Sequence, residues 1–194
     1  MLAGHSILRS TINSLQQLQD EDWEAFREPW KPVSFKRKQL ITQSGGSERY
    51  LYFVLEGVQR IYHLDDSGKE STLLFTYAPS FGGVIDALLL QQPSAYFYEA
   101  LTASEMLRIS YHDLHTLMDS RPAIHSFVTT ALTISLSGLL KRLVELQSCS
   151  SEEKFRRLLK RSPHILQLVP HKYLANYLGI DATNFSKLMN SVRI

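Results

Sequence analysis

The chain has one cysteine, Cys149, and no unbroken run of 18 apolar residues. One cysteine excludes an internal disulfide framework and any four-cysteine zinc or iron–sulfur site within one chain. Without a long apolar run we expect no membrane span and no membrane partner. The first ten residues have one arginine and no sustained apolar stretch, which is not typical of a secretory signal, so we expect a cytoplasmic protein.

The motifs of common enzymes are also missing. The chain has no Gly-x-Ser-x-Gly elbow, P-loop or His-Glu-x-x-His, so we expect no enzyme activity and no catalytic residue. A cupin-like metalloenzyme, the competing enzyme hypothesis, would need two closely spaced strand histidines with a carboxylate and a third histidine. Here the candidates lack that spacing, and no motif marks any of them as an axial haem ligand, so we expect surface or hydrogen-bond-satisfied histidines, no metal and no cofactor. The histidines are His63, His112, His115 and His125.

Positive charge gathers in the C-terminal segment. Residues 1–150 carry 13 Lys and Arg against 16 Asp and Glu, whereas residues 151–194 carry 8 against 3. Residues 171–194 also have the spacing of a helix-turn-helix, with small Ala175 at the helix crossing and Gly179 at the turn. The five positions that must be apolar are Leu174, Leu178, Ile180, Phe185 and Leu188. A basic segment with this motif predicts double-stranded DNA as a partner, against the alternative of a plain helical hairpin.

The outward positions of the two helices supply the candidate DNA contacts. Asp181 is placed to cap the second helix, on which Thr183 can offer its methyl group to thymine and Lys187 can bind a guanine edge. Asn184 would pair with adenine if its side chain faces the groove. The expected phosphate contacts, which set the register on DNA, are Lys172, Tyr173, Asn176 and Ser186.

The middle of the chain changes from helical to two-residue periodicity. Residues 7–30 have apolar positions at helical spacing, whereas residues 33–110 contain alternating segments separated by turn signals. Expected strands cover residues 50–55, 58–64 and 71–77, with turns at Gly57 and residues 65–68. The pattern predicts a small antiparallel barrel or jelly roll.

Residues 122–148 are predicted to form one long helix with two apolar faces. One face carries leucines spaced 4-3-4-3, namely Leu132, Leu136, Leu139, Leu143 and Leu146. The other carries Ile124, Phe127, Ala131, Ile134 and Gly138. We expect one face to pack on the barrel and the leucine seam to form a homodimer; the alternative buries both faces within one chain. Ser151 is expected to cap the following helix.

The order of elements resembles the cAMP receptor protein/fumarate–nitrate regulator (Crp/Fnr) family of transcription regulators. Besides the C-terminal motif, the likeness includes residues 52–57, residues 81–83 and residues 99–105. It implies an α+β protein. Its parts would be N-terminal helices and a cyclic-nucleotide-binding-like β-roll (1–121), a dimerisation helix (122–148) and an all-α helix-turn-helix domain (149–194). It also implies a homodimer on a near-palindromic DNA site, with the roll and the long helix reporting a signal. The sequence does not show whether an unknown small-molecule effector supplies that signal.

The chain departs from the cyclic-nucleotide-binding members of that family in the phosphate cassette. Val84 stands where the resemblance places a glutamate for the ribose, and Ser94 and Ala95 stand where it places an Arg-Ser pair for the phosphate. The lost charge-assisted bond is worth about 1.5–3 kcal/mol. A backbone nest at Gly82 and Gly83 could hold an anion only weakly. We therefore predict that cAMP and cGMP do not bind in the usual way.

Further departures leave other questions open. The iron–sulfur branch of the family needs an N-terminal cysteine cluster, which is missing. The roll could bind another small molecule, apolar or aromatic given Tyr96, Phe97 and Tyr98, or its pocket could be filled by side chains. Ala182, Thr183 and Lys187 stand where the resemblance places two arginines and a glutamate for base contact, and we expect no two-stranded wing after them. The competing function is therefore an effector-sensing or protein-interaction module whose helix-turn-helix no longer binds DNA specifically.

Overall fold

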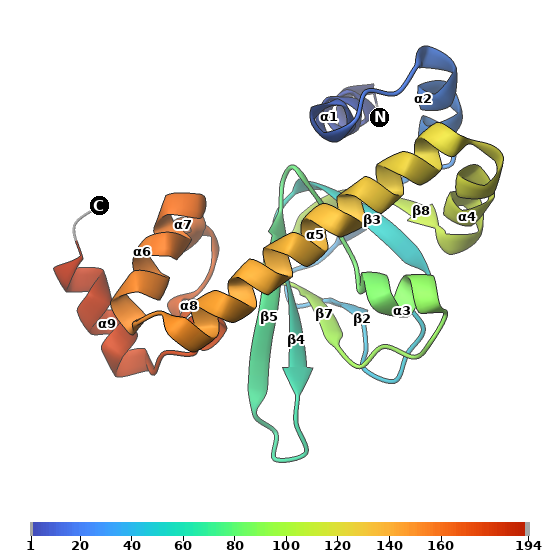
Figure 1. Cartoon of the computed structure of the whole chain (residues 1–194). Helices are drawn as coiled ribbons and strands as arrows, with labels where there is room; N and C mark the ends of the chain where they lie inside the picture. Colours follow the sequence, from blue (N-terminus) through green and yellow to red (C-terminus); the bar gives the residue numbers. More distant parts are fainter. Residues whose placement is uncertain (1, 193–194) are drawn as a thin grey trace.

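A computed structural model describes residues 2–192 and shows a β-roll joined by one long helix to a bundle of short helices (Figure 1). Arg193 and Ile194, with which the predicted motif ended, lie outside the described residues. The strands are β1 (Lys31–Phe35), β2 (Leu40–Thr42), β3 (Tyr50–Glu56), β4 (Val58–Leu64), β5 (Glu70–Tyr77), β6 (Ser80–Gly82), β7 (Phe97–Ala100) and β8 (Ser104–Ser110). The helices are α1 (Leu2–Leu15), α2 (Asp20–Arg27), α3 (Ile85–Leu90), α4 (Tyr111–Ser120), α5 (Pro122–Ser148), α6 (Ser151–Arg161), α7 (Ile165–Leu168), α8 (His171–Leu178) and α9 (Ala182–Ser191).

The strands form two four-stranded antiparallel sheets, in the orders β1-β8-β3-β6 and β2-β7-β4-β5. Buried aromatic and aliphatic side chains fill the space between them, among them Tyr52, Val54, Ile61, Tyr98 and Met106. Gly57 joins β3 to β4 at φ +90°, and a Cβ there would lie 2.4 Å from the Ala103 carbonyl oxygen, so the turn requires glycine. The predicted antiparallel roll is confirmed.

The N-terminal helices cover the sheet that contains β3 and β8. A second core cluster joins α1, α2, α4 and the start of α5 to this sheet, with Leu8, Ile12, Trp23, Phe26, Phe53 and Phe127 among its members. Phe26 and Phe127 meet edge to face with ring centroids 5.8 Å apart. This cluster fixes the first turns of α5 to the roll.

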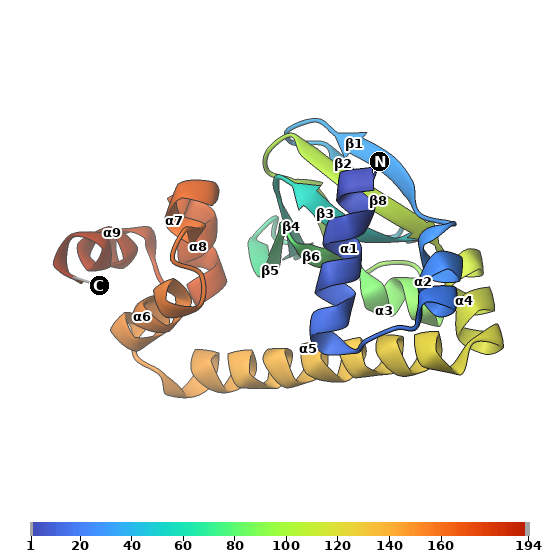
Figure 2. The same cartoon turned by 90° about the horizontal axis from the view of Figure 1, so that it is seen from above.

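Helix α5 has the bounds that the sequence predicts and runs past the roll toward the C-terminal helices (Figure 2). Ile124, Phe127 and Val128 are its buried apolar residues, all in its first two turns. By length and composition alone this helix could cross a membrane, which the criterion of an unbroken apolar run missed. That test is weak evidence, because core helices of soluble proteins pass it too, and this helix packs its first turns on the roll.

Helices α6–α9 form a C-terminal head, defined as residues 151–192. Its core contains Phe155, Leu158, Leu174, Leu178, Phe185 and Leu188. Ser150 rather than the predicted Ser151 caps α6: its hydroxyl accepts from the Glu153 amide, and Glu153 bonds back to the Ser150 amide in a capping box. The expectation was wrong by one residue because only the Ser150 register places a glutamate at the third helical position.

Candidate nucleic-acid interface

Helices α8 and α9 build the predicted helix-turn-helix. Gly179 joins them at φ +64°, in the left-handed region that favours glycine. Ala175 is buried where the helices cross, and the Asp181 side chain caps α9 by accepting from the Asn184 amide at 2.9 Å. The five positions expected to be apolar are all buried. Local spacing therefore fixed both helices and their turn.

One face of this motif is open to solvent. Lys172 at the start of α8 is exposed, as are Thr183 and Lys187 on α9. Ser186 is also exposed and donates a hydrogen bond to the Ala182 carbonyl oxygen at 3.0 Å, while Asn184 is half-buried. These residues thus present hydroxyl, amide and ammonium groups on one surface, and none of them belongs to the apolar core of the head.

The other two proposed phosphate contacts, Tyr173 and Asn176, instead face the roll. The Tyr173 ring lies 3.9 Å from the Arg60 guanidinium carbon. The Asn176 side chain accepts from the Thr72 amide at 2.5 Å and donates to the Glu70 carbonyl oxygen at 2.8 Å. The Asn176 amide is occupied by β5 and the Tyr173 ring stacks on Arg60 of β4, so a role in phosphate binding does not fit this arrangement. The helical spacing of apolar residues shows which side chains of α8 point away from the core of the head. It does not show which of those side chains the roll covers.

Helix α5 holds the head from its other side. Arg142 stacks on the Tyr177 ring, 3.9 Å from its centroid, and donates a hydrogen bond to the Tyr177 carbonyl oxygen. Burial lowers the pKa of the Arg142 guanidinium, because the charged form loses solvation. Glu145, one turn later, forms an ion pair with Arg161 of α6 at 2.9 Å. These contacts tie α5 to both α6 and α8.

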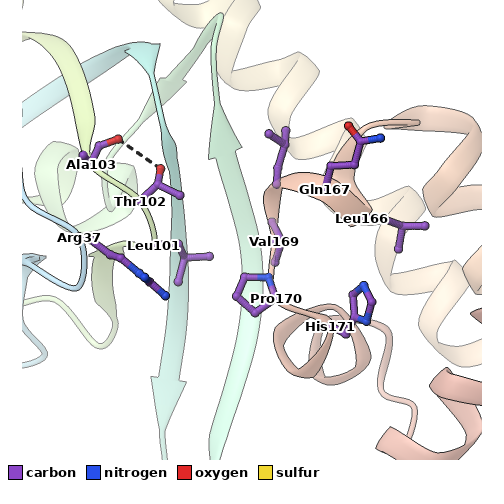
Figure 3. A pocket seen from close by; sticks show the side chains of 10 residues that line it. Arg37, Leu101, Thr102, Ala103, Leu166, Gln167, Val169, Pro170 and His171 are labelled. Atoms are coloured by element: carbon purple, nitrogen blue, oxygen red, sulfur yellow. Dashed lines mark hydrogen bonds between the residues drawn. The ribbon is translucent and has the colours of Figure 1, made fainter.

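A groove of about 640 Å³ separates the roll from the head near the start of α8. Arg37 and residues 101–103 line the roll side, and residues 166–171 line the head side, as Figure 3 shows. Leu101 and Pro170 face each other across it (Figure 3). Contact between roll and head is therefore concentrated on β4 and β5.

The leucine seam of α5 is exposed over its central part. Leu136, Leu139 and Leu143 each leave half or more of their surface open. Leu132 instead packs partly against the roll core, and Leu146 lies beside the α8–α9 turn, 3.9 Å from where a Gly179 Cβ would stand. Leu146 still leaves 38% of its surface open, so the exposed part of the seam runs from Leu136 to Leu146.

The turn that leads into α3 already carries a carboxylate. Gly83, at φ +114°, precedes Val84, whose amide donates to the Glu48 carboxylate at 3.3 Å. Glu48 is buried and also accepts from the Thr42 hydroxyl at 2.5 Å and the Arg49 amide at 3.0 Å. Burial raises the pKa of Glu48, and these hydrogen bonds oppose the shift.

The sequence is similar to a known domain family and to known regulatory proteins. Residues 32–121 match the cyclic nucleotide-binding domain family. Regulatory protein HlyX of Actinobacillus pleuropneumoniae is 25% identical over 170 residues, covering 82% of this chain and 69% of that protein. The cAMP-activated global transcriptional regulator CRP of Haemophilus influenzae is 27% identical over 114 residues, covering 58% of this chain and half of that protein. These matches support the predicted resemblance to the Crp/Fnr family of regulators.

The fold of the chain agrees with that of a solved structure. FixK2 from Bradyrhizobium japonicum has a TM-score of 0.74 at 14% identity, with 83% of each chain covered. The α+β architecture predicted from the sequence, a β-roll followed by a long helix and a helical head, is confirmed.

The remaining cassette positions predicted from the sequence are Ser94, Ala95 and Gly82. Ser94 is buried, and its hydroxyl both donates to the Tyr96 carbonyl oxygen and accepts from the Tyr96 amide. Ala95 is exposed. Gly82 lies against the Tyr98 hydroxyl, which a Cβ would approach to 2.3 Å. Tyr98 is fully buried and bonded to Thr76, so its ring fills the roll beside the cassette turn.

Sequence reasoning missed two residues that the structure makes prominent. Glu48 and Arg60 are both charged and buried, and each meets partners distant in sequence. No motif marks either of them; the only sequence signal for Arg60 is a charge in the middle of a predicted strand. The four histidines considered as ligands are exposed, and residues 2–192 contain no cluster of side chains suited to a metal.

Proposed function

We propose that this protein is a homodimeric transcription regulator that binds double-stranded DNA through α8 and α9 in the cytoplasm. The observation that carries the proposal is the open polar face of the helix-turn-helix, which presents Lys172, Thr183 and Lys187 to solvent. The α9 N-terminus, capped by Asp181, lies beside the same face. Such a surface offers cations for phosphates and hydrogen-bonding groups for base edges. The named relatives are regulators, which favours this function over an enzyme.

The dimer is proposed from the exposed seam of α5. A helix that leaves Leu136, Leu139 and Leu143 in water carries an apolar stripe that a second copy can cover. Two parallel copies of α5 would place both heads at the same end. A two-fold axis along this seam would then present two recognition helices to one near-palindromic site.

We further propose that cAMP does not control this protein in the usual way. The Glu48 carboxyl group already accepts a hydrogen bond from the Val84 amide, so a cyclic phosphate would have to compete with Glu48 for that amide. The Ser94 hydroxyl is engaged and Ala95 offers no cation. Any small-molecule effector of the roll would therefore be recognised by other chemistry. Isothermal calorimetry is expected to show no cAMP or cGMP binding at micromolar concentrations; a micromolar Kd would contradict the proposal.

A salt titration separates the regulator from the competing interaction module. Binding of the full chain to a random duplex is measured between about 50 and 200 mM salt. A regulator gives log affinity that falls linearly with log salt, with a slope that reflects several released counterions. The variant Lys172→Gln should reduce that slope by about one, whereas Lys69→Gln, on the exposed β4–β5 turn, should leave it unchanged. A flat response in the wild type would favour the interaction module.

A further inference from the structure

The roll contains a preformed socket for one side chain of the head. Arg60 of β4 is 2% exposed and forms ion pairs with Glu70 at 2.6 Å and Glu99 at 2.9 Å. The Tyr62 ring lies 4.0 Å from its guanidinium carbon, and the Tyr173 ring of the head lies 3.9 Å from it. Four of these five residues belong to the roll, so the socket (Arg60, Tyr62, Glu70 and Glu99) is assembled without the head. Its carboxylates fix the plane of the guanidinium on which Tyr173 stacks.

A second contact fixes the rotation of the head about that point. β5 is the edge strand of its sheet, and an edge strand presents unpaired amide and carbonyl groups. The Asn176 side-chain amide satisfies one of each, at Thr72 and Glu70, in the way a further strand would. Because Tyr173 and Asn176 lie three residues apart on α8, one helix face is held at two points.

Two aromatic contacts extend the same docking surface. Phe75 of β5 packs against Tyr177 with ring centroids 5.3 Å apart. The Tyr77 hydroxyl lies 2.5 Å from the Ser162 hydroxyl, just after α6. Val58 of β4 belongs to the apolar cluster of the head. The contacts run from α6 to α8, so they hold the head as one body against the β4–β5 hairpin.

This docking leaves the recognition helix free. Thr183, Ser186 and Lys187 of α9 remain exposed while α8 is bound to the roll. We propose that Arg60 is a positioning residue for DNA recognition: through Tyr173 it sets the orientation of the helix-turn-helix, and hence the half-site spacing that a dimer accepts. The inference rests on the proposed dimeric DNA-binding function.

If the orientation of the head is fixed, the affinity for DNA should depend on the spacing between the two half-sites. Adding or removing one base pair between half-sites turns one of them by about 35° relative to the other. A head held by the socket cannot follow that rotation without losing its contacts with α8. Without the socket, the head keeps its α5 contacts through Arg142 and Glu145 but should rotate more easily about the short link between α5 and α6.

The first test needs no DNA. Hydrogen exchange of the full chain is followed at Thr72, whose amide donates to Asn176, and along α8. Arg60→Lys keeps the charge but removes the planar fork, and should speed exchange at both places by roughly tenfold. The matched control is Arg108→Lys, because Arg108 also stacks on a roll tyrosine, Tyr50, at 4.4 Å but is distant from the head. Equal exchange in the two variants would overturn the inference, whatever the protein does with DNA.

The second test uses duplexes with two half-sites recovered by selection from a random pool, at the selected spacing and at one base pair more and less. Wild type and Arg108→Lys should lose affinity on the order of tenfold at the altered spacings, and Arg60→Lys less than about threefold. Affinity for a single half-site should be equal in all three, which separates positioning from loss of folding. An unchanged spacing profile in Arg60→Lys overturns the positioning role alone; failure of the wild type to bind any duplex overturns the DNA-binding proposal as well.

Discussion

The dimer seam can be tested by comparing two residues of α5 that are equally exposed but lie on opposite sides of the helix. Leu143 and Ile134 each leave 50% of their surface open. They are nine residues apart, about two and a half turns, so they point in opposite directions. Only Leu143 lies on the 4-3-4-3 seam, so only its truncation should weaken association.

The expected size follows from the exposed fraction. Complete burial of a leucine side chain is worth about 1.5–3 kcal/mol, so burial of the open half of Leu143 contributes about 1 kcal/mol per copy. Because both copies in a two-fold dimer carry Leu143→Ala, the free energy of association should weaken by about 2 kcal/mol, and the dimer Kd should rise roughly 30-fold. Ile134→Ala should leave the Kd unchanged. Sedimentation equilibrium measures both; equal weakening by the two variants, or a monomeric wild type, would refute the seam.

Three further predictions concern the turn, the cassette and base recognition. Gly179→Ala should lower the free energy of unfolding in urea by about 1–2 kcal/mol, because φ is +64° while nothing closer than 3.9 Å obstructs the new Cβ; unchanged stability would contradict a strained turn. Glu48 has a pKa raised above 4.5 in the folded state, so the folded protein holds that proton more tightly, and stability should fall as the pH rises from 4.5 through the raised value. Glu48→Gln should remove this slope in urea titrations, and an identical slope would exclude Glu48 as its source. Lys187→Gln should cost about 1–3 kcal/mol of discrimination at one guanine in competition binding; an equal loss on all sequences would indicate a phosphate contact instead.

The sequence predicts the elements whose signals are local. Gly179 and the apolar positions around it define the helix-turn-helix, because each requirement acts within a few residues. The strand–Gly57–strand unit and the bounds of α5 follow for the same reason. Ser150 and Ser151 differ only in whether a glutamate stands three residues later, a distinction too fine for propensity alone.

The contacts between parts of the chain could not be predicted in this way. The Asn176 side chain is hydrogen-bonded to residues more than 100 positions earlier, and the Glu48 carboxyl group accepts a hydrogen bond from the Val84 amide, 36 positions later. A periodic pattern shows that α8 has an outward face, but it does not show whether water, DNA or β5 lies against it. The division of the outward residues between DNA and the roll therefore depends on tertiary structure.

Selection of bound sequences from a random duplex pool, with and without cell extract, tests the central claim most directly. A homodimer that carries two copies of the α8–α9 motif should enrich a near-palindrome whose half-sites lie about one helical turn apart, 10–10.5 base pairs. Dependence of that enrichment on extract would reveal an effector. A pool that stays random under both conditions would contradict sequence-specific DNA binding.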